Sequence, residues 1–526
     1  MYVDTQVLIR NGKRSVRHLL RESYREDGKV KKRTISCLSR CSDEEIEAIK
    51  LALKNKRDLV ALKSIDDLKV TQGKSIGALH VINTLAERLG ITVALGQSKQ
   101  GKIALWLIYS RLVAQGSRQS SLRLAETHET SVIEDFPHLH EKALYQNLAW
   151  LSKQQLTLEK RLLKEREVNA LFLYDVTSSY LEGDCNELAN YGYNRDKKKG
   201  KMQIVIGLLT DDQGCPVAIR VFEGNTADTQ TFGGQISLLK EDFGIDNVVI
   251  VGDGGMIKSP QQAALPADYD YITSLSKKEI ETLIQDEVIQ LELFDERLCE
   301  IKLGDKRYIF RRNDVRREEI RKNRRSKEAA LYETIQEQNQ YLQEHPRARV
   351  EVAMGKIQDH AKKLKVDAWH EFSEADRAIT FRVDQAKRQA AEKLDGCYCI
   401  KTTVSEEVAD KETVHKRYKG LSQVERAFRT MKTNHLEIRP LYLRKKEHTQ
   451  GHVFIVMLSY MIQRELQAAW KPLGCPVKEG IELLLTHTTT QIDMANGDSR
   501  MTIPAANEKC SSLMKALGIE PLKSLN

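Results

Sequence analysis

Two hydrophobic patterns divide the chain. From about residue 43 to 168, apolar side chains recur every three or four positions, as in ALHVINTLAERLG and IALWLIYSRLVAQ, which predicts amphipathic helices. Beyond residue 168, apolar runs such as NALFLYDVTS, KMQIVIGLLTDD and NVVIVGDGGM alternate with turns and helical stretches, which predicts the buried strands of a mixed α/β domain. A long, charged, largely helical stretch from about 278 to 393 interrupts this pattern, and GCYCIKTT then resumes it.

The first forty residues have a pattern of their own. The segments QVLI, SVRHLLRESY and KVKKRTISCL are compatible with strands, and Asn11-Gly12 and Asp27-Gly28 are typical of tight hairpin turns. We therefore expect a three-stranded meander. It carries eleven basic and four acidic residues, a net charge of +7. Such a charge favours a DNA-contacting arm, but basic residues also protect exposed sheet edges, so both interpretations stay open.

These patterns predict five segments in the 526 residues. They are a basic β-meander over 1–42, a helical domain over 43–168, an α/β domain formed by 169–277 and 394–470, an insertion domain over 278–393, and a C-terminal helical tail over 471–526.

Composition narrows the class of protein. Hydrophobic residues make up 41% and charged residues 30%, as in ordinary globular proteins. The 83 basic and 74 acidic residues give a net charge of +9, which mildly favours a polyanionic partner. The N-terminus lacks the apolar region of a signal peptide and no apolar run is long enough to span a bilayer, so we expect a soluble protein without a membrane partner.

Two aspartates occupy positions suited to chemistry. Asp175 follows the apolar run ALFLY, and Asp253 follows the run NVVIV and precedes two glycines. Strand ends are where α/β sheets commonly bind ligands, and carboxylate oxygens suit hard cations such as magnesium. Alternatively, each aspartate caps a helix or is a solvated acid at the end of a strand.

A third acid lies in the segment YKGLSQVERAFRTMK. Its apolar residues recur at helical spacing, and a polar face lies beside them. This polar face combines a phenol, a carboxylate and two cations, on Tyr418, Ser422, Glu425, Arg429 and Lys432. By itself, the segment is equally compatible with a salt-bridged surface helix.

Taken together, these segments resemble a known family. LFLYDVTSSYLEG, YGYNRDKKKGKMQIVIGLLTDDQGCPVAIRVFEGNTAD, VVIVGDGGM and YKGLSQVERAFRTMK occur here in the order found in the DDE transposases of bacterial insertion sequences, of the insertion-sequence-four kind. The resemblance runs from about Leu171 to about Arg464. Weaker similarity extends through the N-terminal meander.

The family signature is Tyr, two residues, Arg, three residues, Glu, six residues, Lys. Tyr418, Glu425 and Lys432 match this spacing, whereas Leu421 stands at the Arg position. Any phosphate or carboxylate contact of that Arg is therefore in question here. Arg426 and Arg429 are the neighbouring candidates to replace it.

The resemblance implies a ribonuclease H-like catalytic core in which Asp175, Asp253 and Glu425 bind two Mg²⁺ ions, with Mn²⁺ as a substitute. Two such ions activate the attacking hydroxyl and stabilise the leaving oxygen during in-line displacement at phosphorus. About 170 residues separate Asp253 from Glu425, which accommodates an insertion domain. Asn225 and Asp228 match a family motif near the metal ligands, although an Asx turn before a helix explains them equally well.

Several cations are candidates for contact with the DNA backbone. Tyr418 and Lys432 suit phosphate oxygens, and Arg426 and Arg429 lie beside them. The segment RRNDVRREEIRKNRRSK carries nine basic and three acidic residues and includes Arg321, Arg324 and Arg325. Lys198 and Lys199 belong to a basic stretch that is either a DNA contact or a solvated loop.

The resemblance also implies a sequence of reactions on DNA. Such a transposase binds the terminal inverted repeats of its element, cleaves the ends through a hairpin intermediate and joins the 3′ hydroxyl to target DNA as a homodimer. Residues 1–168 would then serve DNA binding and dimerisation, in a cytoplasmic, nucleoid-associated protein. The alternatives are a ribonuclease H-like endonuclease without joining activity and a non-catalytic DNA-binding regulator.

Overall fold

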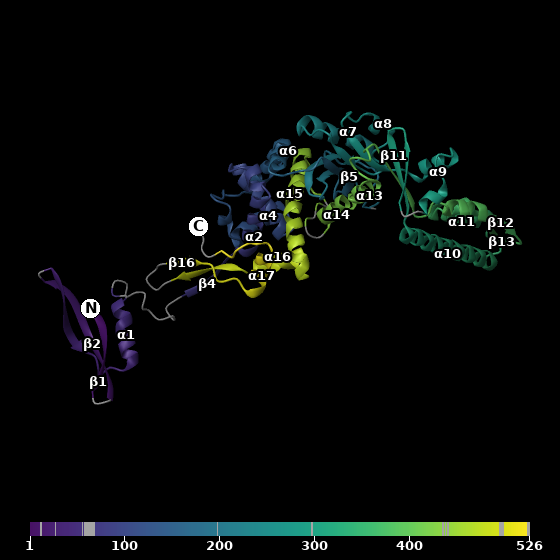
Figure 1. The fold of residues 1–526 in the computed structure, drawn as a ribbon. Coiled ribbons are helices and arrows are strands. Elements are labelled where there is room, and N and C mark those ends of the chain that lie inside the picture. Colours follow the sequence, from purple (N-terminus) through teal and green to yellow (C-terminus); the bar gives the residue numbers. More distant parts are fainter. Residues whose placement is uncertain are drawn as a thin grey trace. The chain divides into compact units, whose positions relative to one another are not determined.

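The chain forms two compact units in a computed structural model (Figure 1). One unit comprises 1–78, 126–131 and 483–526, and the other comprises 79–125 and 132–482. The structure describes residues 1–10, 13–26, 28–54, 56, 69–196, 198–295, 298–433, 436, 438, 441–493 and 499–522.

The first unit begins with the expected antiparallel meander. It consists of β1 (Tyr2–Arg10), β2 (Lys13–Glu26) and β3 (Lys29–Cys37), in the order β1-β2-β3. Every residue of β3 is exposed, so its basic side chains are accessible to a partner. The expected Asn11-Gly12 turn and Asp27 lie outside the described residues.

The rest of this unit corrects two expectations. After α1 (Asp43–Lys54), strand β4 (Lys69–Ser75) lies within the range expected to be wholly helical. The tail expected to be helical contains β15 (Thr488–Asp493) and β16 (Ser499–Thr502) before α17 (Glu508–Ala516). These strands form a sheet in the order β16-β15-β4, which local periodicity cannot reveal because β4 and β15 are more than four hundred residues apart.

A group of helices from both ends of its sequence forms one part of the second unit. Two of them, α4 and α15, are buried around most of their circumference, and both pack against α6. Most of their side chains are apolar, as expected for core helices. The helices outside the sheet region are α2 (Gly77–Arg88), α3 (Ile91–Leu95), α4 (Lys99–Val113), α5 (Arg118–Thr127), α6 (Glu141–Lys164), α15 (Lys446–Trp470) and α16 (Val477–Leu485).

An eight-stranded mixed sheet is the centre of the second unit. Its strand order is β10-β11-β14-β9-β8-β5-β6-β7; β5 and β9 run parallel to β8, and the other neighbours are antiparallel. The strands are β5 (Leu171–Tyr180), β6 (Gln203–Asp211), β7 (Pro216–Glu223), β8 (Val249–Val251), β9 (Asp270–Ser274), β10 (Cys299–Leu303), β11 (Lys306–Arg312) and β14 (Cys397–Thr402).

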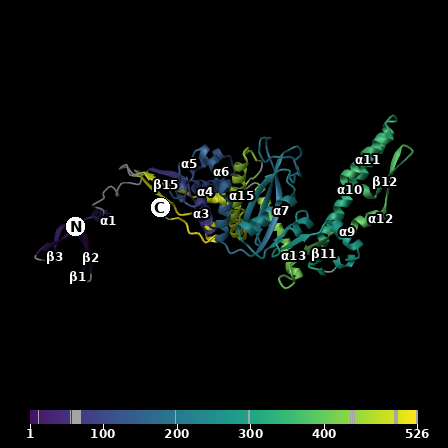
Figure 2. The ribbon, with the colours of Figure 1, turned by 90° about the horizontal axis from the view of Figure 1, so that it is seen from above.

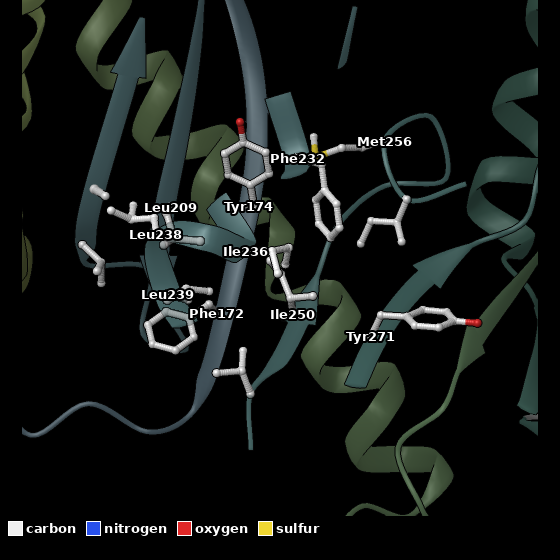
Figure 3. Packing of buried hydrophobic residues seen from close by; sticks show 14 of the residues in the cluster. Phe172, Tyr174, Leu209, Phe232, Ile236, Leu238, Leu239, Ile250, Met256 and Tyr271 are labelled. Carbon is white, nitrogen blue, oxygen red and sulfur yellow. The ribbon is translucent and has the colours of Figure 1, made fainter. Parts of the chain in front are cut away.

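The sheet core determines which way β5 presents its side chains. Phe172 and Tyr174 pack with Phe232 and Ile236 of α7 (Asp228–Ser237), as Figure 3 shows. Successive side chains of a strand point to opposite faces, so Asp175 faces away from this cluster.

The insertion is shorter than expected. Strands β10 and β11, inside the expected range 278–393, belong to the central sheet, because β10 pairs with β11 and β11 pairs with β14. The remaining elements surround a separate core that includes Leu331, Ile357 and Trp369. They are α10 (Asp314–Glu344), α11 (Val350–Leu364), β12 (His370–Ala375), β13 (Ala378–Val383) and α12 (Gln385–Glu392), and Figure 2 shows α10 beside α11.

A short helix, α9 (Lys277–Gln285), precedes β10, and two helices follow β14. These are α13 (Lys411–Lys419) and α14 (Leu421–Lys432), so the segment YKGLSQVERAFRTMK, expected to be helical throughout, is divided between two helices at Gly420. Within the described part of the chain, no helix is both long and apolar enough to cross a bilayer.

Candidate active site

The sheet positions the two aspartates. Asp175 lies within β5, whose residue Leu173 pairs in parallel with Val251 of β8. Continuing this register by two residues brings Asp253 level with Asp175, and adjacent strands are about 4.8 Å apart. The two acids therefore meet because β5 and β8 are parallel neighbours.

Helix α14 supplies the third acid. Val424, Phe428 and Met431 are buried on one face of the helix, as their spacing predicts. Glu425 is exposed next to this apolar face. Since α14 packs against β5, Glu425 is directed to the same side of the sheet as Asp175.

All three acids line one cavity of about 540 Å³. The structure thus brings together carboxylates separated by about 250 residues of sequence, along with two of the cations expected to contact DNA. The cavity is lined by Asp175, Val176, Thr177, Arg195, Asp196, Asp253, Glu425, Phe428, Arg429, Lys432 and Thr433.

Two acids of this cavity, Asp175 and Asp253, have pKa values above the ordinary value of an aspartate. Burial raises the pKa of Asp175 to about 7, and the negative charges of Asp253 and Glu425 add to the rise, against a hydrogen bond from the Val176 N–H (2.8 Å). Burial and the charge of Asp228 likewise raise the pKa of Asp253. A nearby cation would relieve this repulsion.

The donor chemistry fits a hard divalent cation. Three carboxylates offer only oxygen ligands, which suits Mg²⁺ or Mn²⁺. Among the residues that the structure describes, however, no three His, Cys, Asp or Glu side chains are already gathered around a single metal position. The three carboxylates therefore suit a divalent cation because their ligand atoms are oxygens and because all three line the same cavity.

Close backbone packing holds Asp253 and Tyr418 near each other. A Cβ on Gly254 would lie 2.1 Å from the carbonyl oxygen of Ser274, so only glycine permits this approach of the turn to β9. The Ser274 side chain hydrogen-bonds Tyr418, whose pKa is raised by burial and by the charges of the three acids. Tyr418 therefore lies close to the acids, although it belongs to α13 and not to the helix of Glu425.

Arg195 and Asp228 form an ion pair beside the acids. Arg195 Nη2 lies 2.5 Å from both carboxylate oxygens of Asp228, and its charge opposes the rise in the pKa of Asp175 and Asp253. Asp228 begins α7. Asn225 is exposed in the turn before that helix and is not among the described residues that line the cavity.

Lys432 and the two arginines of the same helix, Arg426 and Arg429, have different surroundings. Lys432 Nζ lies 3.0 Å from the carboxylate of Asp196, whereas Arg429 is exposed and lines the cavity. Leu421 begins α14 and is not one of the described residues around the cavity. Arg426 is exposed and its charge acts on Tyr460 of α15, so Arg429 is the better placed of the two candidate replacements.

The remaining cations expected to bind DNA differ in their exposure and in their partners. Arg324 forms hydrogen bonds of 2.8 and 3.0 Å with Asp395, whose side chain is fully buried, so its charge stabilises the insertion. Arg325 is exposed and Arg321 pairs with Glu318 at the surface. Lys198 and Lys199 are exposed, and Lys198 lies over the ring of Tyr180.

Sequence reasoning did not assign several of the cavity's residues to the site, among them Thr177 and Asp196. Thr177 lines the cavity because it lies two positions after Asp175 on β5, and strand alternation could have identified it. Asp196 also lines the cavity, although the sequence places it in a basic stretch. Its partnership with Lys432, 236 residues away, has no local signal.

Comparisons with known proteins identify the family of this chain. Residues 168–462, more than half of the chain, match the family described as Transposase DDE domain, and residues 8–61 match the IS1634 family transposase N-terminal domain. No curated protein matches the chain. Among solved structures, it is similar to a piggyBac transposase in a synaptic complex with hairpin DNA, with a TM-score of 0.35 and 8% identity over 79% of this chain and 69% of that chain. The chain belongs to the DDE transposases of bacterial insertion sequences.

Proposed function

We propose that this transposase binds the terminal inverted repeats of its element, cleaves the element ends and joins the 3′ hydroxyl to target DNA. One observation carries the proposal: Asp175, Asp253 and Glu425, from two parallel strands and one helix, line the same cavity. Cleavage and joining are the same displacement at phosphorus with water or a 3′ hydroxyl as the nucleophile, so one site serves both.

A ribonuclease H-like core is part of the proposal. The segment β7-β6-β5-β8-β9 combines three antiparallel strands with two further strands parallel to β5. This order supports such a core, with Asp175 on its first strand and Asp253 after its fourth.

Asp175, Asp253 and Glu425 would hold two Mg²⁺ ions. When bound, such ions supply positive charge at the reacting phosphate and lower the pKa of an attacking hydroxyl. The chain contributes further groups of its own. Arg429 reaches the same cavity and is suited to a phosphate oxygen, and Tyr418 has a hydroxyl near the acids.

The proposed partners are double-stranded DNA at the element ends and the target, and a second copy of the chain in the DNA complex. A hairpin intermediate at the element end and action on nucleoid DNA in the cytoplasm complete the proposal. The exposed basic strand β3 supports a role for the meander in end binding.

The test is a reaction with a duplex that carries one terminal inverted repeat, Mg²⁺ and a supercoiled target plasmid. The proposal predicts both cleaved ends and joined products, and neither in chelator. Cleavage without joining would identify an endonuclease. End binding without either reaction in Mg²⁺ or Mn²⁺ would identify a regulator.

A further inference from the structure

A second cavity, of about 410 Å³, is built from helices and is basic. Its walls come from α4, α5, α6, α15 and the segment before α15. No carboxylate is among the described residues that line it: Arg111, Gly116, Ser117, Arg118, Tyr145, Leu441, Tyr442, Leu443 and His452.

Two arginines are buried in this cavity. Arg118 and Arg111 are 7% and 6% exposed. Arg118 Nη2 lies 2.7 Å from Nδ1 of His452, which is itself 5% exposed. The guanidinium donates this hydrogen bond, so His452 accepts it as a neutral ring, and the positive charge stays on the arginines.

Three arginines outside this cavity, with side chains at most 17% exposed, have carboxylate partners. Arg307 binds Glu300 at 2.5 Å, Arg166 binds Asp211 at 2.5 Å, and Arg324 binds Asp395 at 2.8 Å. A buried charge is costly unless it is paired. Arg118 has an imidazole in place of the acid, within the part of the chain that the structure describes.

The pKa values of Arg118 and His452 reflect their burial and the positive charges beside them. Burial, together with the charge of Arg111, lowers the pKa of Arg118 to about 9. Burial and the charges of both arginines lower the pKa of His452 well below its ordinary value. An anion in the cavity would offset both effects.

The first turn of α5 adds donors to the same cavity. Gly116, Ser117 and Arg118 line it, and Ser117 Oγ accepts a hydrogen bond from the Ser120 N–H at 3.2 Å, which fixes the start of this ten-residue helix. The N–H groups at a helix start and the helix dipole favour an oxyanion. Two arginines and a helix start therefore converge on one cavity.

We propose that this cavity binds a phosphate group. The group would accept hydrogen bonds from Arg118 and from the first turn of α5, with the charge of Arg111 nearby. The phosphate belongs either to the DNA backbone or to a free phosphate. Only the DNA source rests on the proposed function, because the cavity is separate from the carboxylate site.

The test is equilibrium dialysis of the full chain against radiolabelled orthophosphate, in chelator and without DNA. Chelator removes any metal that could bind phosphate at the carboxylates. The wild type should bind one phosphate saturably, and Arg118→Gln should weaken this binding at least about tenfold, as expected for a lost charge-assisted hydrogen bond. Arg123→Gln, an exposed change of equal charge on the same helix, should bind normally.

A second variant guards against misfolding of Arg118→Gln. Ser117 is exposed at the N-cap, where Asp is also favoured, so Ser117→Asp should preserve the helix while its charge repels phosphate. It should also weaken binding about tenfold. The proposal is overturned if the wild type shows no saturable binding, or if Ser117→Asp binds as the wild type does.

A parallel titration with DNA identifies the source of the phosphate. If Ser117→Asp and Arg118→Gln weaken DNA binding and reduce its salt slope by about one, the phosphate belongs to DNA. Unchanged DNA binding with loss of orthophosphate identifies a free phosphate. A wild-type protein that fails to cleave DNA would contradict the proposed function and leave the dialysis result standing.

Discussion

Lys432 and Asp196 are joined by an ion pair of 3.0 Å, with side chains only 10% and 3% exposed. Lys432 is the lysine of the family signature, and the sequence alone suggests a contact with DNA phosphate. In the structure, its ammonium neutralises a buried acid at the edge of the carboxylate cavity. Lys432 therefore has a structural role whether or not it also contacts DNA.

Replacing Lys432 should destabilise the protein. Lys432→Met leaves the buried carboxylate of Asp196 without this cation and should lower the free energy of unfolding by about 3 kcal/mol. The double variant with Asp196→Asn should recover most of the loss, as measured by denaturant unfolding. The matched change Arg429→Met, at an exposed position of the same cavity, should leave stability unchanged and weaken DNA cleavage.

The raised pKa of Asp175 makes stability depend on pH. Its pKa is about 7 in the folded protein and ordinarily 3.8, so folding favours the protonated acid. The stabilisation from protonation is present at low pH and is lost as pH rises through 7. In chelator, Asp175→Asn should therefore raise the melting temperature relative to the wild type by at least about 2 °C more at pH 8 than at pH 5.

The control for this pH effect is Asp184→Asn, which removes an exposed acid nearby in the sequence. Its melting temperature should differ from that of the wild type by the same amount at both pH values. If the difference for Asp175→Asn is also the same at both pH values, the pKa of Asp175 is not raised in the metal-free protein.

The surface cations Arg321 and Arg325 of α10 should bind DNA without reading its sequence. Changing Arg321 and Arg325 to Glu should weaken binding to terminal-repeat and random DNA alike and reduce the salt slope by about two. Arg324→Glu should instead lower the melting temperature, because it places a second acid beside buried Asp395. A loss confined to terminal-repeat DNA would indicate base recognition by α10.

The meander should contribute to recognition of the element ends. Changing Lys29 and Lys32 on exposed β3 to Ser should reduce the preference for terminal-repeat over random DNA. The full chain is required, because a fragment ending near residue 168 would lack β15, the partner of β4. Lys509→Ser with Lys515→Ser, on α17, is the charge-matched control. An unchanged preference in a competition assay would assign recognition elsewhere.

The sequence predicts the carboxylate site better than its surroundings. Apolar runs identify β5 and β8, so the acids that follow these runs could be selected, and the apolar face of α14 shows where Glu425 lies. The expected strand end at Asp175 is wrong, because β5 continues to Tyr180. Both signals are local. Only the family motifs indicated that the two aspartates and Glu425 belong to one site.

Features that depend on distant pairing had no such signal. Strand β4 pairs with β15, and Arg118 meets His452 across 334 residues. Likewise, β10 and β11 join the central sheet although they lie within a charged stretch. Periodicity describes one segment at a time, so it cannot show which segments meet.

The most direct test of the central claim separates catalysis from binding. Asp175→Asn, Asp253→Asn and Glu425→Gln should each abolish Mg²⁺- or Mn²⁺-dependent cleavage and joining of terminal-repeat DNA, because each removes a carboxylate from the same cavity. End binding should stay largely intact, since it depends on distant cations, and Asp184→Asn should remain active. Near-normal cleavage by Asp175→Asn, or cleavage and joining by the wild type in chelator, would contradict the account.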